Sequence, residues 1–531
     1  MERAEDMIGP SAIRQRPERL AWLLCSLVPF AFGGLALALG QDANWDLKNY
    51  HWYNPYALLT DRWQFDLAPG SFYNPAIDVP TYLAAQVISA QALTFVLGLI
   101  HGLNFILLFA LTRMALLRPV GSRATMAAAA IAFVGVIGGG HLGILGTTFG
   151  DNVVSLWVFA SILLVVQAQK TAWRLRKIVA AGVVMGVAVG LKLPMAVFAV
   201  GFCAALLFVG GPFRLRLTLA FSFGIGVLGG IAISAGYWLW LMAQDFGNPF
   251  FPYFNGFFRS PLGLESSYRD VRFIPKDILT AIFFPFVFSL DTQRIGEIVF
   301  RDFRIAAAYA LWIVTGIMLM LRRRSDEPLM APATGRYLAI AALCVLAVWT
   351  PLFAIYRYII PLEMLAPLLC VAAIGLWPLP LPTRVAIASI VLVFVSVTAM
   401  PGTWTRQSQW TAHLVEVDVP PISDPAHTMV VMVGFDPASY VIPAFPPQIP
   451  FLRLQGYFND PNDRDTGFNR LLRRRIAVHD GDIFLVVAEW EEDKAARVLA
   501  HYGLAADFVH CADLVTNLSR DLKWCALSRV P

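Results

Sequence analysis

The sequence QDANWDLKNYHWYNPYALLT, residues 41–60, differs sharply in character from the segment that precedes it. Residues 20–40 form an almost unbroken apolar run, whereas the quoted stretch is rich in polar and aromatic side chains. A run of about 20 apolar residues is long enough for a helix to cross a bilayer. Residue 41 therefore marks the point where the chain first leaves an apolar environment, and the other segments can be ordered from it.

The composition is that of an integral membrane protein. Of 531 residues, 57% are hydrophobic and only 15% are charged, whereas soluble proteins carry about 25% charged residues. The net charge of +5 is modest, and many Arg and Lys residues flank apolar runs, where they orient membrane helices. We therefore do not expect nucleic-acid binding. From about Gly402 onward the composition is that of ordinary soluble protein.

Basic residues beside the apolar runs predict the topology, because they stay on the cytoplasmic side. Arg14, Arg16 and Arg19 place the N-terminus inside, and the run 322–324 marks a later inner end. Alternate crossing then predicts an all-α polytopic membrane protein with about eleven transmembrane helices. The hydrophobic segments at 178–191 and 194–209 are taken as two short spans, since one long span would reverse everything after it. The expected spans are 20–40, 91–116, 124–140, 153–169, 178–191, 194–209, 217–242, 305–321, 337–350, 359–376 and 385–400.

Three parts follow from this topology. They are a cytoplasmic tail (1–19), a membrane domain (20–401) with long outer loops at 41–80 and 243–304, and a small soluble α/β domain (402–531) outside, in the periplasm. Cys511 and Cys525 of the last part could form a disulfide in an oxidising compartment. Within this domain, strands are expected at 428–433, 483–488, 507–510 and 524–528, and helices at 469–478 and 491–502.

The first outer loop carries the leading candidate for chemistry, Asp46. A helix over 45–53 would place Asn49 and Tyr50 on the same face as Asp46. Burial at a membrane surface raises the pKa of a carboxyl group, so Asp46 could act as a general base. The alternative is that Asp46 and Asp42 only solvate a loop or cap a helix. The neighbouring candidates for substrate binding are Lys48, Asn49, Tyr50 and His51.

Further ionisable residues lie near the predicted outer face. Asp151 follows the third span and could supply a second acid, sharing a divalent cation with the first loop, or could simply cap a helix. Lys192 and Arg357, with Tyr358 beside it, could bind a phosphate group. Glu363 is expected to pair with Arg357. Snorkelling and a structural ion pair are the alternative, and His101 and His141 are expected to be satisfied core histidines.

The pattern resembles the GT-C superfamily of membrane glycosyltransferases, which use polyprenyl-phosphate-linked sugars and include oligosaccharyltransferases. The resemblance rests on a cytoplasmic N-terminus, the acidic motif Asn44-Trp45-Asp46 in a long first outer loop, and a second acid at Asp151. It rests also on about eleven spans and an outer C-terminal domain. It covers the architecture of residues 20–400 rather than a long sequence signature. The family's motif often has two adjacent acids, whereas Trp45 separates Asp46 from Asn44 here and Asp42 lies four residues away.

The resemblance implies that Asp46 is the catalytic base and Asp151 a secondary acid or metal ligand. It implies transfer of a sugar, with inversion, from a polyprenyl-phosphate donor to a glycan, lipid or protein acceptor at the outer face of a bacterial inner membrane. Some members need a divalent cation such as Mg²⁺ or Mn²⁺, and the acids here leave metal dependence open. Lys192 and Arg357 are assigned to the donor phosphate by charge alone.

Other classes of function compete with this interpretation. A transporter or flippase of a lipid-linked or small polar substrate is the main alternative, although transporters typically show internal repeats and mid-membrane acids, and neither is evident. A polysaccharide polymerase or ligase, or a sensor with an external domain, would also fit. The sequence leaves the donor sugar, the acceptor, the oligomeric state and the role of the C-terminal domain undetermined.

Overall fold

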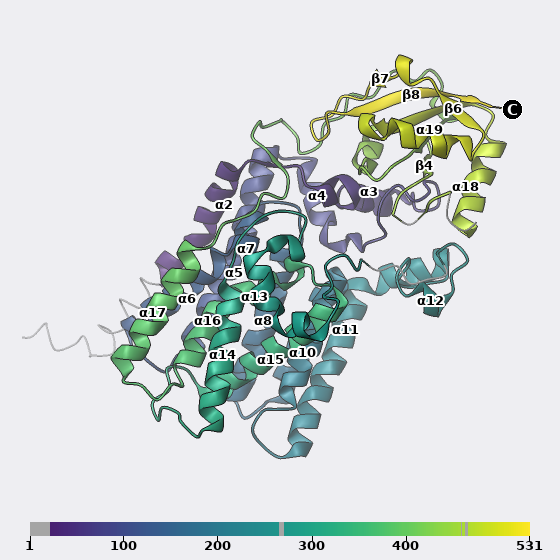
Figure 1. The fold of residues 1–531 in the computed structure, drawn as a ribbon. Helices are drawn as coiled ribbons and strands as arrows, with labels where there is room; N and C mark the ends of the chain where they lie inside the picture. The colour runs from purple at the N-terminus through teal and green to yellow at the C-terminus, as the bar shows by residue number, and fades with distance from the viewer. Residues whose placement is uncertain (1–21, 265–269, 458, 462–465, 531) are drawn as a thin grey trace, which may run out of the picture. The chain divides into compact units, whose positions relative to one another are not determined.

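The computed structural model describes residues 22–264, 270–457, 459–461 and 466–530, so the expected tail at 1–19 lies outside the described residues. The chain divides into two compact units. The helical unit comprises the described parts of 1–39, 94–234 and 271–404, and the sheet unit those of 40–93, 235–270 and 405–531. Each unit is described by itself, and the labels follow Figure 1. The first outer loop and the C-terminal segment therefore belong to one unit.

The helical unit is a bundle in which most helices lie side by side (Figure 1). Two helices contain a boundary between the units. In α5 the helical unit begins at Thr94, and in α11 it ends at Ser234. The helices are α2 (Val28–Leu39), α5 (Ala90–Ala115), α6 (Ser122–Val136), α7 (Gly139–Gly143), α8 (Asp151–Lys170), α9 (Leu175–Leu191), α10 (Ala196–Leu206), α11 (Phe213–Phe246), α13 (Ile278–Leu290), α14 (Arg304–Met320), α15 (Pro332–Leu352), α16 (Ile360–Ile374) and α17 (Leu381–Val397), with short 3₁₀ turns at Leu193–Met195 and Tyr356–Ile359.

Among the described residues, six helices are long and apolar enough to cross a membrane, judged by length and composition. Each predicted span in the described chain coincides with a helix to within a few residues. Five further apolar helices are shorter, so the count of eleven spans stays a prediction. The six longer helices are Trp22–Leu39, Ala90–Ala115, Asp151–Lys170, Phe213–Phe246, Pro332–Leu352 and Tyr356–Ile374.

Hydrogen bonds between loops show that the helices run back and forth. Before α14, Arg301 exchanges backbone hydrogen bonds of 2.9 Å with Met400, which follows α17. Beyond the other end of α14, the Glu327 carbonyl accepts a hydrogen bond of 2.8 Å from Arg384 at the start of α17. Helices α14 and α17 therefore run antiparallel, as alternate crossings require. Which end faces the cytoplasm stays a prediction.

Glycine contacts settle the direction of α9 and α11. A Cβ atom on Gly182 or Gly186 would lie 2.1 Å from the carbonyl oxygen of Phe223 or Val227, respectively. The residue numbers of the contacting pairs increase together along both helices. Helices α9 and α11 therefore run parallel, with their backbones in close approach. The chain must therefore return between them, and it does so through α10. Two separate segments at 178–209, rather than one long helix, are confirmed.

The sheet unit contains a sheet in the order β4-β3-β5-β8-β6, with β7 paired to β8. Strands β4 and β5 both run parallel to β3, whereas β8 is antiparallel to β5. Strand β3 is buried along its whole length, and four of its five residues are Met or Val, so it contributes an apolar centre to the sheet. The elements are β1 (Gln41–Asp42), α3 (Tyr53–Thr60), α4 (Val79–Ala85), α12 (Asn255–Phe258), β2 (Arg406–Gln407), β3 (Thr428–Met432), β4 (Phe451–Arg453), α18 (Gly467–Val478), β5 (Asp482–Ala488), α19 (Glu492–Ala500), β6 (Leu504–Ala506), β7 (Ala512–Asp513) and β8 (Leu522–Arg529).

The first outer loop is fastened to the C-terminal sheet. Leu67 makes a parallel bridge with Leu452 of β4. Arg62 is buried and donates to the carbonyls of Pro447 (2.6 Å) and Ile449 (2.7 Å), while it pairs with Asp66 at 2.8 Å. This buried ion pair also satisfies two backbone carbonyls, so it ties the first outer loop to the segment before β4. Removing either charge would leave the other buried without a partner, which is costly.

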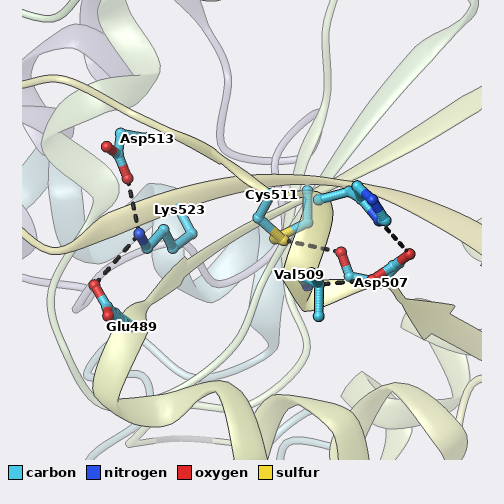
Figure 2. Close-up of a disulfide and its surroundings, with 8 residues drawn as sticks. Glu489, Asp507, Val509, Cys511, Asp513 and Lys523 are labelled. Atoms are coloured by element: carbon cyan, nitrogen blue, oxygen red, sulfur yellow. Dashed lines mark hydrogen bonds and ion pairs between the residues drawn. A yellow bond between two sulfur atoms is a disulfide. The ribbon is translucent and has the colours of Figure 1, made fainter.

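The predicted disulfide between Cys511 and Cys525 forms, and it links the segment before β7 to β8 (Figure 2). The strand predicted at 507–510 is wrong. Residues Phe508–His510 form a 3₁₀ turn, because the Asp507 side chain accepts the backbone N–H of Val509 at 3.2 Å and holds the chain in a tight turn. The other predicted strands and helices of this domain are confirmed within a few residues.

Candidate functional site

Asp151 is the first residue of α8, and its side chain is fully buried. The carboxylate makes no capping hydrogen bond, since the cap position is Gly150. The turn before it needs glycine at position 146, where φ is +72° and a Cβ atom would lie 2.5 Å from Ala36 Cβ. The capping role considered for Asp151 is therefore not the one it has here, and its charge is available for other partners.

Two cations meet this carboxylate. Lys192 Nζ lies 2.8 Å from one oxygen of Asp151, and an Nη atom of Arg357 lies 3.5 Å from the other. Lys192 follows the last residue of α9, where the backbone turns extended (φ −147°, ψ 101°). Arg357 lies in the 3₁₀ turn that leads into α16. We call Asp151, Lys192 and Arg357 the basic triad. Its members come from three helix ends that are far apart in sequence. The sequence predicts that these three ends lie at the same face of the membrane.

Aromatic rings hold the two cations. The Arg357 guanidinium lies 4.2 Å from the centre of the Phe149 ring, and Lys192 Nζ lies 5.8 Å from the centre of the Tyr358 ring. Attraction between a cation and a ring face strengthens when water is excluded. The lysine and arginine side chains are 14% and 13% exposed. The role of Phe149 was not predicted. The only sign of it in the sequence is that an aromatic residue stands two positions before Asp151.

The basic triad carries more positive than negative charge, with one carboxylate against two cations. Arg offers a planar fork that matches the oxygens of a phosphate, while Lys supplies a compact charge. Each cation keeps a small exposed fraction. The arrangement can therefore bind an anion such as a phosphate.

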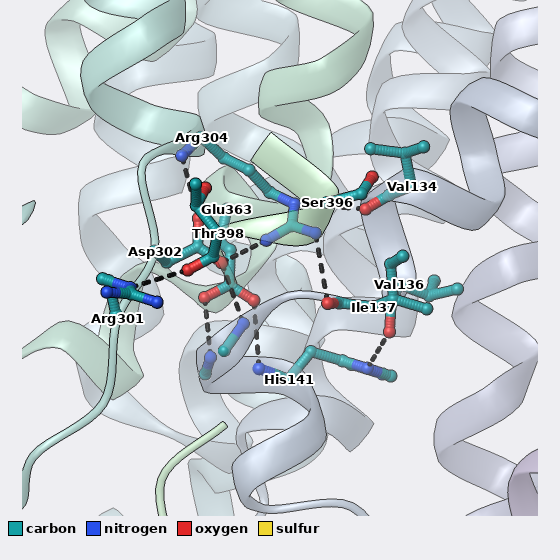
Figure 3. A network of polar contacts seen from close by, with 12 residues as sticks. Val134, Val136, Ile137, His141, Arg301, Asp302, Arg304, Glu363, Ser396 and Thr398 are labelled. Carbon is teal, nitrogen blue, oxygen red and sulfur yellow. Dashed lines mark hydrogen bonds and ion pairs between the residues drawn. The ribbon is translucent and has the colours of Figure 1, made fainter. Parts of the chain in front are cut away.

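A second buried cluster lies in the same unit and was only partly predicted (Figure 3). Asp302 forms an ion pair with Arg304, and both side chains are fully buried. Arg304 also donates to the carbonyls of Val134 and Ile137, at 3.1 Å each. This ion pair is thus tied to the end of α6.

Glu363 completes this cluster through the N-terminal turn of α7. Its carboxylate accepts the backbone N–H groups of Gly140 (2.9 Å) and His141 (3.0 Å), while Asp302 accepts that of Gly139 (2.8 Å). The start of a helix offers unpaired N–H groups, which carboxylates satisfy. We expected Glu363 to pair with Arg357, but Arg357 is drawn instead to Asp151. We call Asp302, Arg304 and Glu363 the closed cluster.

Both histidines lie in the core, as expected, although the Nε2 of His141 has no hydrogen-bond partner among the described residues. His141 is buried, and its Nδ1 lies 2.7 Å from the Val136 carbonyl oxygen. His101 is buried as well, and its Nδ1 accepts the backbone N–H of Gly146 at 3.1 Å. Both satisfy backbone groups in the core of the helical unit.

Asp46 lies in the sheet unit and is only 8% exposed. The predicted helix over 45–53 is confirmed in part, because Leu47–His51 is helical but forms a π-helix, and α3 starts only at Tyr53. The wider turn shifts the residues that share a face with Asp46, and π-turns occur often at functional sites. The neighbouring acid, Asp42, is buried and accepts two hydrogen bonds from the Asn44 amide, at 2.7 and 2.9 Å.

The other candidates of this loop mostly hold the loop together. The Asn49 amide donates to Ser71 at 2.9 Å, and His51 pairs with Asp78 at 2.6 Å, both buried. The Tyr50 ring lies 4.3 Å from that of His51. The Lys48 carbonyl accepts a hydrogen bond from Ser439. These contacts give the loop one defined shape, which is what a positioned carboxylate requires.

A divalent cation does not fit these acids in the arrangement found. Within the described residues, no three side chains of His, Cys, Asp or Glu gather as a metal site would require. The oxygens of Asp151 face two cations and those of Asp42 face an amide. The proposed reaction therefore assigns no step to a metal.

No protein-family model and no curated protein sequence matches this chain. Three solved structures of an Archaeoglobus fulgidus oligosaccharyltransferase resemble it in structure: the apo form, a complex with Zn and sulfate, and a form tethered to an acceptor peptide by a disulfide. Identities are 15%, 13% and 12%, and TM-scores are 0.45, 0.46 and 0.43. The matches cover 90%, 90% and 94% of this chain and 71%, 69% and 74% of the other.

Oligosaccharyltransferases are also among the enzymes that the sequence pattern resembles. At TM-scores below 0.5 the likeness carries no weight for activity, donor or acceptor. The function is argued from the residues of this chain.

Proposed function

We propose that this chain is a membrane glycosyltransferase of the GT-C type, which moves a sugar from a polyprenyl-phosphate donor to an acceptor hydroxyl or amine. The observation that carries the proposal is the basic triad, in which two largely buried cations face one carboxylate at the ends of three apolar helices. The phosphate of a lipid carries the negative charge that two cations attract, and it lies at the bilayer surface, where apolar helices end.

The proposed reaction gives each group a separate role. The acceptor oxygen or nitrogen attacks the anomeric carbon, and its proton passes to the Asp46 carboxylate as the new bond forms. The bond between the anomeric carbon and the phosphate oxygen breaks on the opposite face, with inversion, and polyprenyl phosphate leaves with the electron pair. Lys192 and Arg357 stabilise the charge that develops on the leaving phosphate. The role of Asp151 is then to fix both cations.

The proposed setting is a bacterial inner membrane, with residues 20–401 as the membrane domain and 402–531 in the periplasm. The disulfide between Cys511 and Cys525 supports this side for the C-terminal domain, because disulfides persist in oxidising compartments. The acceptor would then be a glycan, lipid or protein of the cell envelope.

The test is transfer from a panel of radiolabelled polyprenyl-phosphate sugars in membranes that contain the wild type, Asp46→Asn or Asp61→Asn. Asn keeps the shape of Asp but cannot take up the proton. Asp61 is exposed and ends α3 in the same loop, so it is a matched control. We expect one donor to be consumed by the wild type and by Asp61→Asn, and a loss of about 10²–10⁴-fold in Asp46→Asn.

Full activity in a folded Asp46→Asn variant would remove Asp46 as the base. If no donor is consumed by the wild type with crude membranes as acceptor, the glycosyltransferase proposal fails. Uptake of a lipid-linked sugar without transfer would then favour a transporter.

A further inference from the structure

The carboxyl edge of the C-terminal sheet has the topology of a ligand-binding edge. The strand order β4-β3-β5 means that the chain passes from β3 to one neighbour and then across to the other. Both neighbours run parallel to β3. In open α/β sheets, ligands bind outside the carboxyl ends of the strands where the order reverses in this way. Here that point lies between β3 and β5.

The loop after β3 is held rigidly at this point. The buried Glu491, which follows β5, accepts the backbone N–H groups of Phe435 (2.9 Å) and Asp436 (3.0 Å). Gly434 has a φ of +103°, and a Cβ atom there would lie 2.0 Å from a Glu491 oxygen. Lys494 balances the Glu491 charge at 2.9 Å. A loop fixed by its backbone can present side chains without paying an ordering cost on binding.

Aromatic rings join this edge to the loop that carries Asp46. The Phe435 ring lies 5.1 Å from that of Tyr457, which in turn lies 5.4 Å from that of Trp45. Tyr457 is 45% exposed, and the other two rings are half-buried. Trp45 directly precedes Asp46 in the chain. We call Trp45, Phe435 and Tyr457 the aromatic row.

Polar groups that both donate and accept hydrogen bonds accompany the aromatic row. Arg453 at the end of β4 donates to the Asp436 carbonyl at 2.7 Å, while its Nε has no hydrogen-bond partner among the described residues. The Gln455 amide donates to Asp460 at 2.6 Å, and within the same described part of the chain its oxygen accepts no hydrogen bond. Buried polar groups are normally satisfied, so these atoms mark a place where a polar ligand or water belongs.

We propose that the aromatic row and its polar neighbours form a binding subsite for the acceptor, and that the acceptor portion bound there is a saccharide. A sugar ring has an apolar C–H face, which matches an aromatic ring, and a rim of hydroxyls, which both donate and accept. Carboxylate, amide and guanidinium groups beside the rings match that rim. This inference rests on the proposed function, because it places the acceptor beside the loop of the candidate base.

An extended peptide fits this edge less well. Peptides often bind by adding a strand to an open sheet edge. The outer side of β4 is already paired where Leu67 bridges Leu452, and the Arg453 N–H donates to the Leu67 carbonyl at 2.9 Å. The first outer loop thus occupies the backbone groups that an added strand would use.

The experiment is binding of soluble tetrasaccharides to the purified full chain in detergent, without donor. The probes are mannotetraose, cellotetraose and chitotetraose, and binding is followed by saturation-transfer NMR and calorimetry. The variants are Trp45→Ala, Tyr457→Ala and the control Phe508→Ala. Phe508 is a half-buried aromatic residue of the same unit, which lines a separate pocket with α19 and β6. Stacking on one ring contributes about 1–3 kcal/mol in comparable base–aromatic contacts, so we expect affinity to fall about 5–150-fold.

Binding of at least one probe that weakens in Trp45→Ala and in Tyr457→Ala but not in Phe508→Ala supports the subsite. Absence of binding for all probes at about 10 mM, a concentration well above weak carbohydrate affinities of about 1 mM, overturns it. Equal binding in the aromatic variants and the wild type also overturns it. Because no donor is present, this measurement can fail while transfer by the wild type succeeds, so the two proposals fail separately.

Discussion

The basic triad and the closed cluster are two buried charge groups of the same unit, and their charge excesses are opposite. The closed cluster has two carboxylates and one guanidinium, while the basic triad has one carboxylate and two cations. In the closed cluster, three backbone N–H groups of α7 balance the surplus negative charge. Its Asp302 and Arg304 side chains are fully buried, whereas both cations of the triad retain some exposure.

The difference teaches how to separate structural charges from functional ones. Perturbed or buried charges occur at both kinds of site, so burial alone does not distinguish them. In the closed cluster the helix start serves as a built-in partner for the carboxylates. In the basic triad, we propose, the two cations beside one carboxylate serve a ligand that binds and leaves. The next three predictions test that contrast.

The largest effect is expected from Asp302→Ala. Removing the carboxylate leaves Arg304 charged in a fully buried place, which costs about 3–5 kcal/mol of stability. Thermal unfolding of the purified protein in detergent measures the loss. The control is Asp291→Ala, which breaks an exposed pair with Arg294 and should cost at most about 1 kcal/mol. Equal stability of the two variants would mean that the closed cluster does not brace the fold.

Lys192→Met should act on transfer rather than on the fold. We expect kcat to fall about 10²–10³-fold, because one group that stabilises the leaving phosphate is gone. The control is Lys276→Met, an exposed lysine of the same unit, which should retain full activity. Transfer assays with the panel of lipid-linked sugars measure the change, and unfolding temperatures confirm folding. A Lys192→Met enzyme that works normally would assign the triad to structure.

The smallest effect is expected from inorganic phosphate. A ligand of the folded state at about ten times its Kd stabilises by about 1.4 kcal/mol, so phosphate should raise the unfolding temperature of the wild type by a few degrees. Lys192→Met should lose the rise and Asp302→Asn should keep it. Chloride at the same ionic strength controls for screening. An identical rise in wild type and Lys192→Met would show that phosphate acts elsewhere.

Hydropathy and charge predicted the helices well, because a bilayer imposes length and apolarity on each span. They also placed Lys192, Arg357 and Asp151 at one side, since alternation fixes which helix ends meet. The actual pairing was not predictable, because Arg357 and Glu363 lie close in sequence while their partners lie on other helices. The glycines at 138–140 were the sequence feature that indicated a close contact there. A Cβ atom at position 138 would clash with the Glu363 carboxylate.

The loop around Asp46 shows the other limit. Its aromatic and polar density was visible in the sequence. The π-helix at Leu47–His51 was not, since it depends on packing rather than on propensity. Nor could the sequence show that Arg62 and Asp66 fasten this loop to segments almost four hundred residues away.

The fastening of the first outer loop to β4 also sets an order of events during synthesis. The ribosome completes residues 41–93 early, but the carbonyls that receive Arg62 belong to Pro447 and Ile449, near the end of the chain. Chains are made from the N-terminus at about 5–20 residues per second. The loop with Asp46 thus waits tens of seconds for its anchor. A nascent chain released before β4 would possess its apolar helices yet lack the clamp that shapes its candidate base.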